Sequence, residues 1–164
     1  MERNLIVLAH ALPGIIGLAL GLGVLKPPRP GDGRAWMRWL YTACVAALLL
    51  FLVTLVITDW TTLDATAQIA FGGLVVLGAV MGIRLAAAHR EAITQATGWE
   101  GRYIQHVYFT YISLWIGFLI VPAINSPLPA LFVPMVVVGA LIVGGTLVSR
   151  FKKRVIGTAA GTAP

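Results

Sequence analysis

Charge is scarce in this chain of 164 residues, because Asp, Glu, Lys and Arg together make up only 11% of it, whereas 59% is hydrophobic. In an ordinary soluble domain about a quarter of the residues are charged. Mean hydropathy is +0.89, so too few polar side chains remain to cover a water-facing surface. This composition excludes a soluble enzyme, and the high hydrophobic content excludes a disordered regulator.

Cysteine and catalytic motifs are also lacking. Cys44 is the only cysteine and cannot pair within the chain, which excludes a secreted scaffold held by disulfides. The sequence contains no nucleophile elbow, no His-Glu-x-x-His, no phosphate-binding loop and no Cys-x-x-Cys. No catalytic residue and no metal site is therefore predicted, and whether the protein is an enzyme stays open.

Long apolar runs are what the chain does contain. Five runs of about 20 residues have the length that crosses a bilayer as an α-helix, and they cover 5–25, 40–58, 67–88, 103–123 and 130–149. We therefore expect an all-α integral membrane protein, a bundle of five transmembrane helices that forms a single membrane domain over residues 1–164. Residues 150–164 are expected to form a short basic cytoplasmic tail.

Basic residues are distributed unevenly along the chain. Every Lys and Arg except Arg3 lies within 26–38, within 84–102 or after residue 149, whereas 59–66 holds two Asp and no basic residue. Because Lys and Arg in short loops resist translocation, we predict an external amino terminus and a cytoplasmic carboxyl terminus in the bacterial cytoplasmic (inner) membrane. The basic groups flank helices without an aromatic stripe, so they predict contact with anionic lipid and no nucleic-acid partner.

Small residues at helical spacing predict where the helices pack closely. The expected packing faces are Gly14 with Gly17 and Gly21, Gly78 with Gly82, and Ala140 with Gly144.

Three prolines interrupt the outer halves of the predicted helices, and they are Pro13, Pro122 and Pro134. Each removes a backbone hydrogen bond and leaves a carbonyl without its helical partner. Two outcomes follow from this, a kinked and slightly polar outer vestibule or kinks that neighbouring helices compensate.

Ionisable side chains inside a membrane span are costly and are functional candidates. The predicted spans contain His10, Arg84 and His106 but no Asp, Glu or Lys, and His89 lies at the cytoplasmic interface. Histidine ligates haem and related tetrapyrroles, so His10, His89 and His106 are candidate cofactor-binding residues, with a structural role against a neighbouring helix as the alternative. His10 and His106 are expected roughly 20 Å apart along the membrane normal, which excludes one metal bound by both.

Polar and small residues follow one face of the fourth run, and they are His106, Thr110, Ser113 and Gly117, flanked by Gln105, Tyr108 and Tyr111. Such a face turns away from lipid. It predicts either a site for a headgroup, a quinone or a small polar ligand that opens to the cytoplasm, or the central helix of the bundle with interhelical hydrogen bonds. The candidate ligand-lining residues are Gln105, Tyr108, Thr110 and Ser113.

Several stretches carry a resemblance to known sequences: the run from His10 to Gly21, the basic turn ending in Arg38 and Tyr41, the helix end from Arg84 to Arg90, and segments 103–122 and 134–139. Together they resemble an uncharacterised family of bacterial predicted membrane proteins, a domain of unknown function with several spans and recurrent histidines. The resemblance covers most of the chain and implies a multi-span bundle whose histidines are suspected of function, without a known activity. That family is expected to carry a histidine in the first basic loop, where this sequence has Arg34 and Arg38.

Three functions are consistent with these features. The first is an accessory or binding subunit packed against partner membrane helices or against itself, and the small-residue faces and scarce buried charge favour it. The second is a haem- or pigment-binding redox protein that uses the intramembrane histidines. The third is a carrier for a small or lipidic ligand along the polar face of the fourth helix.

Overall fold

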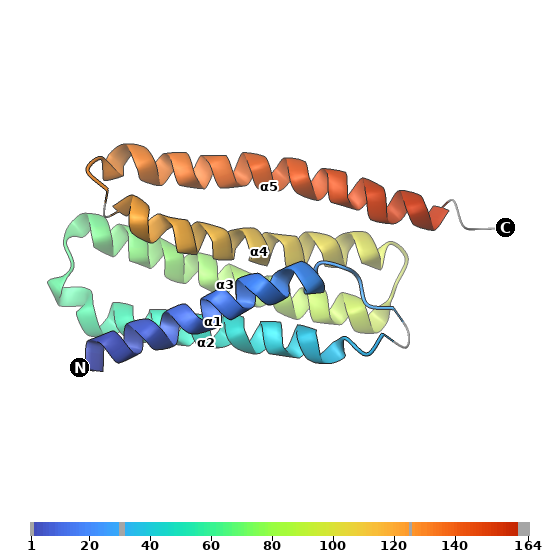
Figure 1. Ribbon diagram of the computed structural model, residues 1–164, viewed down its shortest axis with the longest axis horizontal. Helices are drawn as coiled ribbons and strands as arrows, with labels where there is room; N and C mark the ends of the chain where they lie inside the picture. Colours follow the sequence, from blue (N-terminus) through green and yellow to red (C-terminus); the bar gives the residue numbers. More distant parts are fainter. Residues whose placement is uncertain (1, 30–31, 125, 161–164) are drawn as a thin grey trace.

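A computed structural model describes residues 2–29, 32–124 and 126–160. The chain forms five α-helices, α1 (Glu2–Val24), α2 (Ala35–Asp59), α3 (Ala65–Thr94), α4 (Trp99–Ile124) and α5 (Pro129–Ala160), with a short 3-10 turn η1 (Trp60–Thr62) after α2. Successive helices run in opposite directions, so the two ends of the chain lie at opposite ends of the bundle (Figure 1). The expected all-α fold class is confirmed, since the described residues form no strand.

Local chemistry sets several helix ends. The Asp64 carboxylate caps α3 by accepting a hydrogen bond of 2.7 Å from the backbone N–H of Ala67. α3 ends where Gln95 turns into the left-handed region at φ 47°. Pro129 begins α5, at the position where a missing N–H removes no helical hydrogen bond.

The helices are longer than the apolar runs that predicted them. α2 begins at Ala35 instead of residue 40, α3 continues to Thr94, and α5 extends to Ala160, so residues 150–160 are helical rather than a separate tail. Hydropathy marks where charged side chains begin, whereas the backbone stays helical as long as those side chains reach water. The last four residues of the predicted tail, 161–164, lie outside the described part of the chain.

Four segments are long and apolar enough to cross a membrane, and they are Ala35–Thr62, Ala65–Thr94, Trp99–Ala123 and Leu131–Phe151. The described apolar part of α1, Leu8–Val24, is shorter. The chain is thus a helical bundle with several apolar helices, compatible with a multi-pass membrane protein. A fifth span through α1 stays a prediction.

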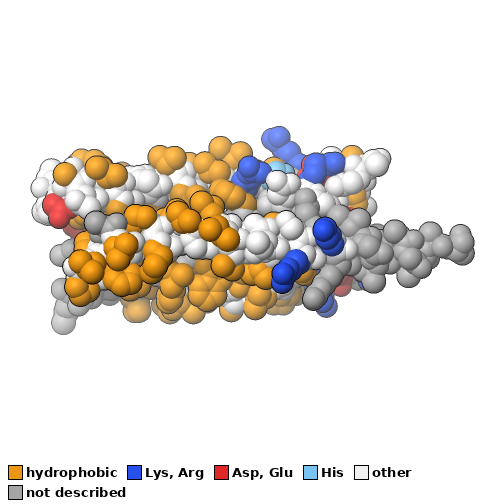
Figure 2. Space-filling view, turned by 90° about the horizontal axis from the view of Figure 1, so that it is seen from above, with side chains coloured by type: hydrophobic (Ala, Val, Ile, Leu, Met, Phe, Trp, Pro, Cys, Tyr) orange, Lys and Arg blue, Asp and Glu red, His pale blue; other side chains and the backbone are white. Residues whose placement is uncertain are grey.

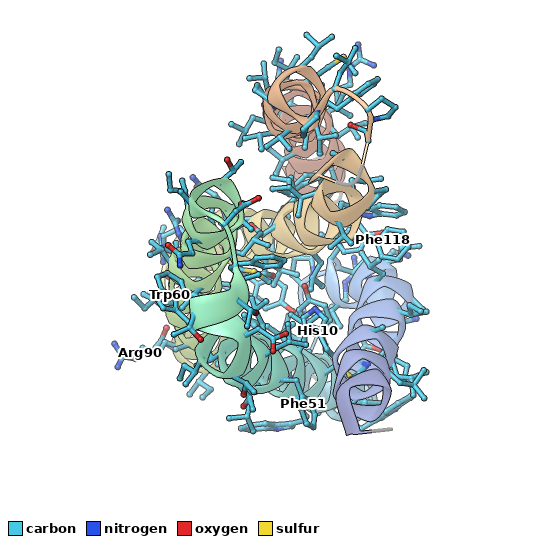
Figure 3. All side chains as sticks on the ribbon, turned by 90° about the vertical axis from the view of Figure 1, so that its left-hand side faces the viewer. His10, Phe51, Trp60, Arg90 and Phe118 are labelled. Carbon is cyan, nitrogen blue, oxygen red and sulfur yellow. The ribbon has the colours of Figure 1, made fainter. Side chains whose placement is uncertain are left out.

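α4 is the central helix of the bundle. It contacts α1, α3 and α5, and half of its apolar stretch is buried, the largest share among the four segments. Seen from the amino-terminal end, α1, α2, α3 and α4 surround a common interior, and α5 lies outside them on α4 (Figure 3). The fully buried side chains at the centre are Tyr41, Val45, Tyr103, Ile104, Val107 and Thr110.

The predicted glycine face of α1 packs against its neighbours. A Cβ atom at Gly14 would lie 2.8 Å from Cδ1 of Leu48 on α2, and one at Gly21 would overlap the ring of Tyr111 on α4. Gly17 lies between the same two helices. The absence of side chains therefore allows the close approach of α1 that the sequence predicted.

The other two predicted faces are correct in part. Gly78 faces Leu49 of α2, and a Cβ at Gly144 would lie 3.1 Å from Ile112 of α4. The prediction is wrong for Gly82, where nothing lies within 4 Å of a Cβ position. The reason is that α3 and α2 share only a small contact, which does not extend to the next turn of α3.

Candidate functional site

A cavity of about 380 Å³ lies between α1, α2, α3 and α4, in the half of the bundle nearest the amino terminus. This volume falls in the usual range of small-molecule sites, about 300–1,000 Å³. Its wall is almost entirely apolar and includes Leu48, Phe71 and Met81. Among the described side chains, His10 and Ser113 are the only polar ones that line it.

Small residues and a proline leave this space open. Gly117 of α4 lines the cavity, and no atom lies within 4 Å of the position its Cβ would take. Pro122, one turn further along α4, also lines it and lacks the N–H of a regular helix. The cavity thus occupies the half of the bundle that holds Pro13 and Pro122, where the sequence left open a slightly polar vestibule, but its wall is almost entirely apolar.

The cavity reaches the surface of the bundle at Phe118. This side chain lines the cavity and yet is 54% exposed, and Figure 3 shows it beside α1.

His10 reaches the cavity from α1. Its Nδ1 lies 3.1 Å from the Leu48 carbonyl oxygen of α2, and the side chain points toward the interior enclosed by the four helices (Figure 3). A carbonyl only accepts, so Nδ1 carries the hydrogen and donates. In the neutral ring Nε2 then keeps its lone pair and can accept a hydrogen bond or bind a metal.

Ser113 reaches the cavity from α4. The residue is only 4% exposed, and its hydroxyl forms no hydrogen bond with a described residue, in contrast to Thr110 one turn earlier. Every buried side-chain oxygen or nitrogen among the described residues has a hydrogen-bond partner, so the Ser113 oxygen is accessible from the cavity that it lines. The Ser113 hydroxyl is therefore a polar group in an apolar wall that is available to a ligand.

His106 lies away from the cavity, beside α3. Its Nδ1 is 3.4 Å from Nη1 of Arg84, and the guanidinium carbon of Arg84 lies 5.2 Å from the ring centroid of Phe109. A guanidinium only donates, so His106 Nδ1 is the acceptor here. Arg84 of α3 therefore contacts two residues of α4 and ties the two helices together.

His89 lies at the basic end of the bundle. Its ring stacks on Trp39 at a centroid distance of 4.8 Å, and its Nε2 is 2.9 Å from the Thr42 hydroxyl oxygen. Thr42 donates its own hydrogen to the Arg38 carbonyl at 2.8 Å, so His89 Nε2 must be the donor. This histidine connects α3 to α2.

The structure does not bring the three histidines together. Of the three, only His10 lines the cavity, and His106 lies about 10 Å further along α4 than Ser113 at the usual helical rise. Among the described residues no three His, Cys, Asp or Glu side chains form a group that could hold a metal ion. A tetrapyrrole held by two histidines does not fit this arrangement, and His10 alone keeps a free ring nitrogen facing the cavity.

The predicted ligand-lining residues separate in the same way. Ser113 lines the cavity, but Thr110 is fully buried and accepts a hydrogen bond of 3.0 Å from Tyr41, since its own hydrogen goes to the Val107 carbonyl. Tyr108 is buried outside the cavity, and Gln105 is exposed. The polar face of α4 thus serves mainly to join α4 to its neighbours.

Sequence reasoning missed most of the cavity wall because that wall is apolar. Leu48, Phe71 and Met81 look like ordinary lipid-facing or core residues in the sequence. The signal that could have found the site is the grouping of Pro13 and Gly14 on α1 with Gly117 and Pro122 on α4, in the same half of the predicted bundle.

The opposite end of the bundle carries the positive charge. Figure 2 shows Lys and Arg side chains gathered toward one end and a hydrophobic surface over much of the rest. The described basic side chains are Lys26, Arg29, Arg34, Arg38, Arg84, Arg90, Arg102, Arg150 and Lys153. Glu91 pairs with Arg102 through two hydrogen bonds of 2.7 and 2.9 Å, which joins the end of α3 to the start of α4.

Comparison with protein-family models, curated proteins and solved structures finds no match to this chain. The resemblance to an uncharacterised bacterial membrane family therefore stays a prediction, and the site's own geometry has to carry the functional argument.

Proposed function

We propose that the protein binds a small, predominantly apolar molecule inside the bilayer, in the cavity between α1, α2, α3 and α4. The observation that carries this proposal is the cavity itself, about 380 Å³ in volume, whose described wall is apolar except at His10 and Ser113. Well-packed helical interiors leave few voids larger than a water molecule. A polar solute or ion pathway would need more polar groups along its wall. Binding of a lipidic ligand, as a carrier or as a storage site, fits this wall best.

A cavity-filling substitution tests this proposal. Gly117→Leu places a side chain in the cavity without a clash, because the space around the Cβ position is open. Gly145→Leu is the matched control, since that position on α5 is equally open and lies outside the cavity. We expect mass spectrometry of protein purified from native membranes to detect a retained small molecule in the wild type and the control but not in Gly117→Leu. Equal retention in all three proteins would contradict the proposal.

We also propose that α1 is a fifth span and that the basic end faces the cytoplasm of a bacterium. The clustering of basic side chains at one end, opposite Asp59 and Asp64, supports this orientation. In a Cys44→Ala background, Thr61→Cys should react with a membrane-impermeant thiol reagent in intact cells. Asp32→Cys should react only after permeabilisation. The reverse pattern would overturn the orientation, and reaction of both cysteines in intact cells would overturn the span between them.

An accessory role beside other membrane proteins stays a second proposal. α5 packs against α4, and most of its large apolar side chains are exposed, so lipid or another helix must cover it in a bilayer. Mass measurement in a mild detergent separates these cases. A monomer without a co-purifying protein would contradict the accessory role and leave the binding proposal intact.

The redox or pigment alternative now depends on His10 alone. A tetrapyrrole bound there would take its axial bond from Nε2, because Nδ1 is engaged with Leu48. An absorption spectrum of protein purified from native membranes tests it directly. A protein without a Soret band would exclude this alternative.

A further inference from the structure

We infer that the molecule bound in the cavity is a neutral alcohol or phenol, whose hydroxyl group is recognised by His10 and Ser113. This inference rests on the proposed binding function, and it names the chemical class of the ligand. It follows from the hydrogen bonds that the two polar side chains in the cavity wall can form and from the lack of charge around them.

The Nδ1–H of His10 is used by the Leu48 carbonyl at 3.1 Å, so Nε2 is left as an acceptor in the neutral ring. The neutral ring is the form expected here, because no described acidic side chain lines the cavity to offset a positive charge. An acceptor requires a ligand that donates. A carbonyl, ether or ester oxygen cannot form this hydrogen bond, whereas a hydroxyl can.

The Ser113 hydroxyl has no hydrogen-bond partner among the described residues, although the residue is 4% exposed. Leaving such a group unmatched in an apolar environment is unfavourable. An oxygen atom on the ligand can accept its hydrogen. Because a hydroxyl group both donates and accepts, one hydroxyl on the ligand matches the acceptor of His10 and the donor of Ser113.

Among the described side chains, no Lys, Arg, Asp or Glu lines the cavity, so a phosphate, carboxylate or ammonium headgroup would be buried there without a counter-charge. Water alone would satisfy the two polar groups but would leave the remaining apolar wall in contact with water, and apolar cavities favour apolar occupants. The wall therefore selects a neutral hydroxyl group on an apolar body.

Two isomeric probes test this inference, the alcohol 1-decanol and the ether 1-methoxynonane. They have the same composition, but only 1-decanol has a hydroxyl hydrogen to donate. Their apparent dissociation constants are measured from the ligand-dependent shift of thermal unfolding in detergent. We expect the wild type to bind 1-decanol about tenfold more tightly than 1-methoxynonane, the value of one hydrogen bond. His10→Ala and Ser113→Ala should each reduce this preference toward equal binding.

Tyr108→Phe is the matched control, since it removes the hydroxyl of a residue of α4 that does not line the cavity, and the preference for 1-decanol should persist. Equal binding of both probes by the wild type, with loss of both in Gly117→Leu, would overturn the hydroxyl inference and support the binding function. Binding of neither probe by the wild type would overturn both. A preference for 1-decanol that survives in both Ser113→Ala and His10→Ala would also overturn the inference. If either variant does not fold, the ratio of the two dissociation constants in the wild type decides the question.

Discussion

The Tyr103 hydroxyl donates a hydrogen bond of 3.0 Å to the Val24 carbonyl and so ties the start of α4 to the end of α1. In a continuing helix the Val24 carbonyl would accept from the N–H of residue 28, but that residue is Pro28 and has none. Pro27 removes the partner of the preceding carbonyl in the same way. A tyrosine distant in sequence therefore supplies the donor that the local sequence lacks.

Replacing this donor should destabilise the bundle. Tyr103→Phe keeps the ring but leaves the Val24 carbonyl unpaired in a buried position, which costs about 1–3 kcal/mol. Thermal unfolding in a mild detergent measures the loss. Tyr108→Phe is the control, because the Tyr108 hydroxyl forms no hydrogen bond in the structure. Equal stability of Tyr103→Phe and the wild type would contradict the assigned role.

The hydrogen bond from Tyr41 to Thr110 should couple α2 to α4. The two oxygens lie 3.0 Å apart and both residues are fully buried. In a double-mutant cycle with Tyr41→Phe and Thr110→Val, we expect a coupling energy of about 0.6–1.7 kcal/mol, the range of hydrogen bonds between membrane helices. Strictly additive effects of the two substitutions on the free energy of unfolding would show that the contact contributes nothing.

Two glycines should respond in opposite ways to the same substitution. Gly21→Ala places a methyl group against the ring of Tyr111, a residue of the buried core, so a loss of about 1–3 kcal/mol is expected from overpacking. Gly82→Ala adds a methyl group in open space and should be neutral or stabilising by up to about 1 kcal/mol, because alanine favours the helix. Equal unfolding midpoints for both variants would argue against the packing of α1 on α4.

The ion pair between Glu91 and Arg102 should contribute little and depend on salt. Both oxygens of Glu91 bond the guanidinium at 2.7 and 2.9 Å, but the Arg102 side chain is 45% exposed. Glu91→Gln is expected to lower the unfolding midpoint slightly at low salt. The difference from the wild type should vanish near about 1 M salt, where the screening length falls to about 3 Å. A deficit that persists there would indicate a role beyond the charge.

The polar residues of the sequence predicted a ligand site along one face of α4, whereas the cavity lies between α1, α2, α3 and α4. The polar face of α4 runs toward the basic end of the bundle, where His106 contacts Arg84 and Thr110 contacts Tyr41. Those hydrogen bonds use the polar groups within the protein. The cavity lies in the other half of the bundle, and it was not visible in the sequence because its wall is made of residues typical of any apolar helix.

What the sequence alone determined is the helical class, the approximate position of each apolar helix and the gathering of basic residues at alternate loops. These properties are local, since each helix satisfies its own backbone hydrogen bonds and hydropathy adds along the chain. Only the tertiary structure decided which nitrogen of His10 is free, which hydroxyl is left without a partner and where the space for a ligand lies. A void depends on how closely several helices approach one another, and that distance is set by side chains far apart in the sequence.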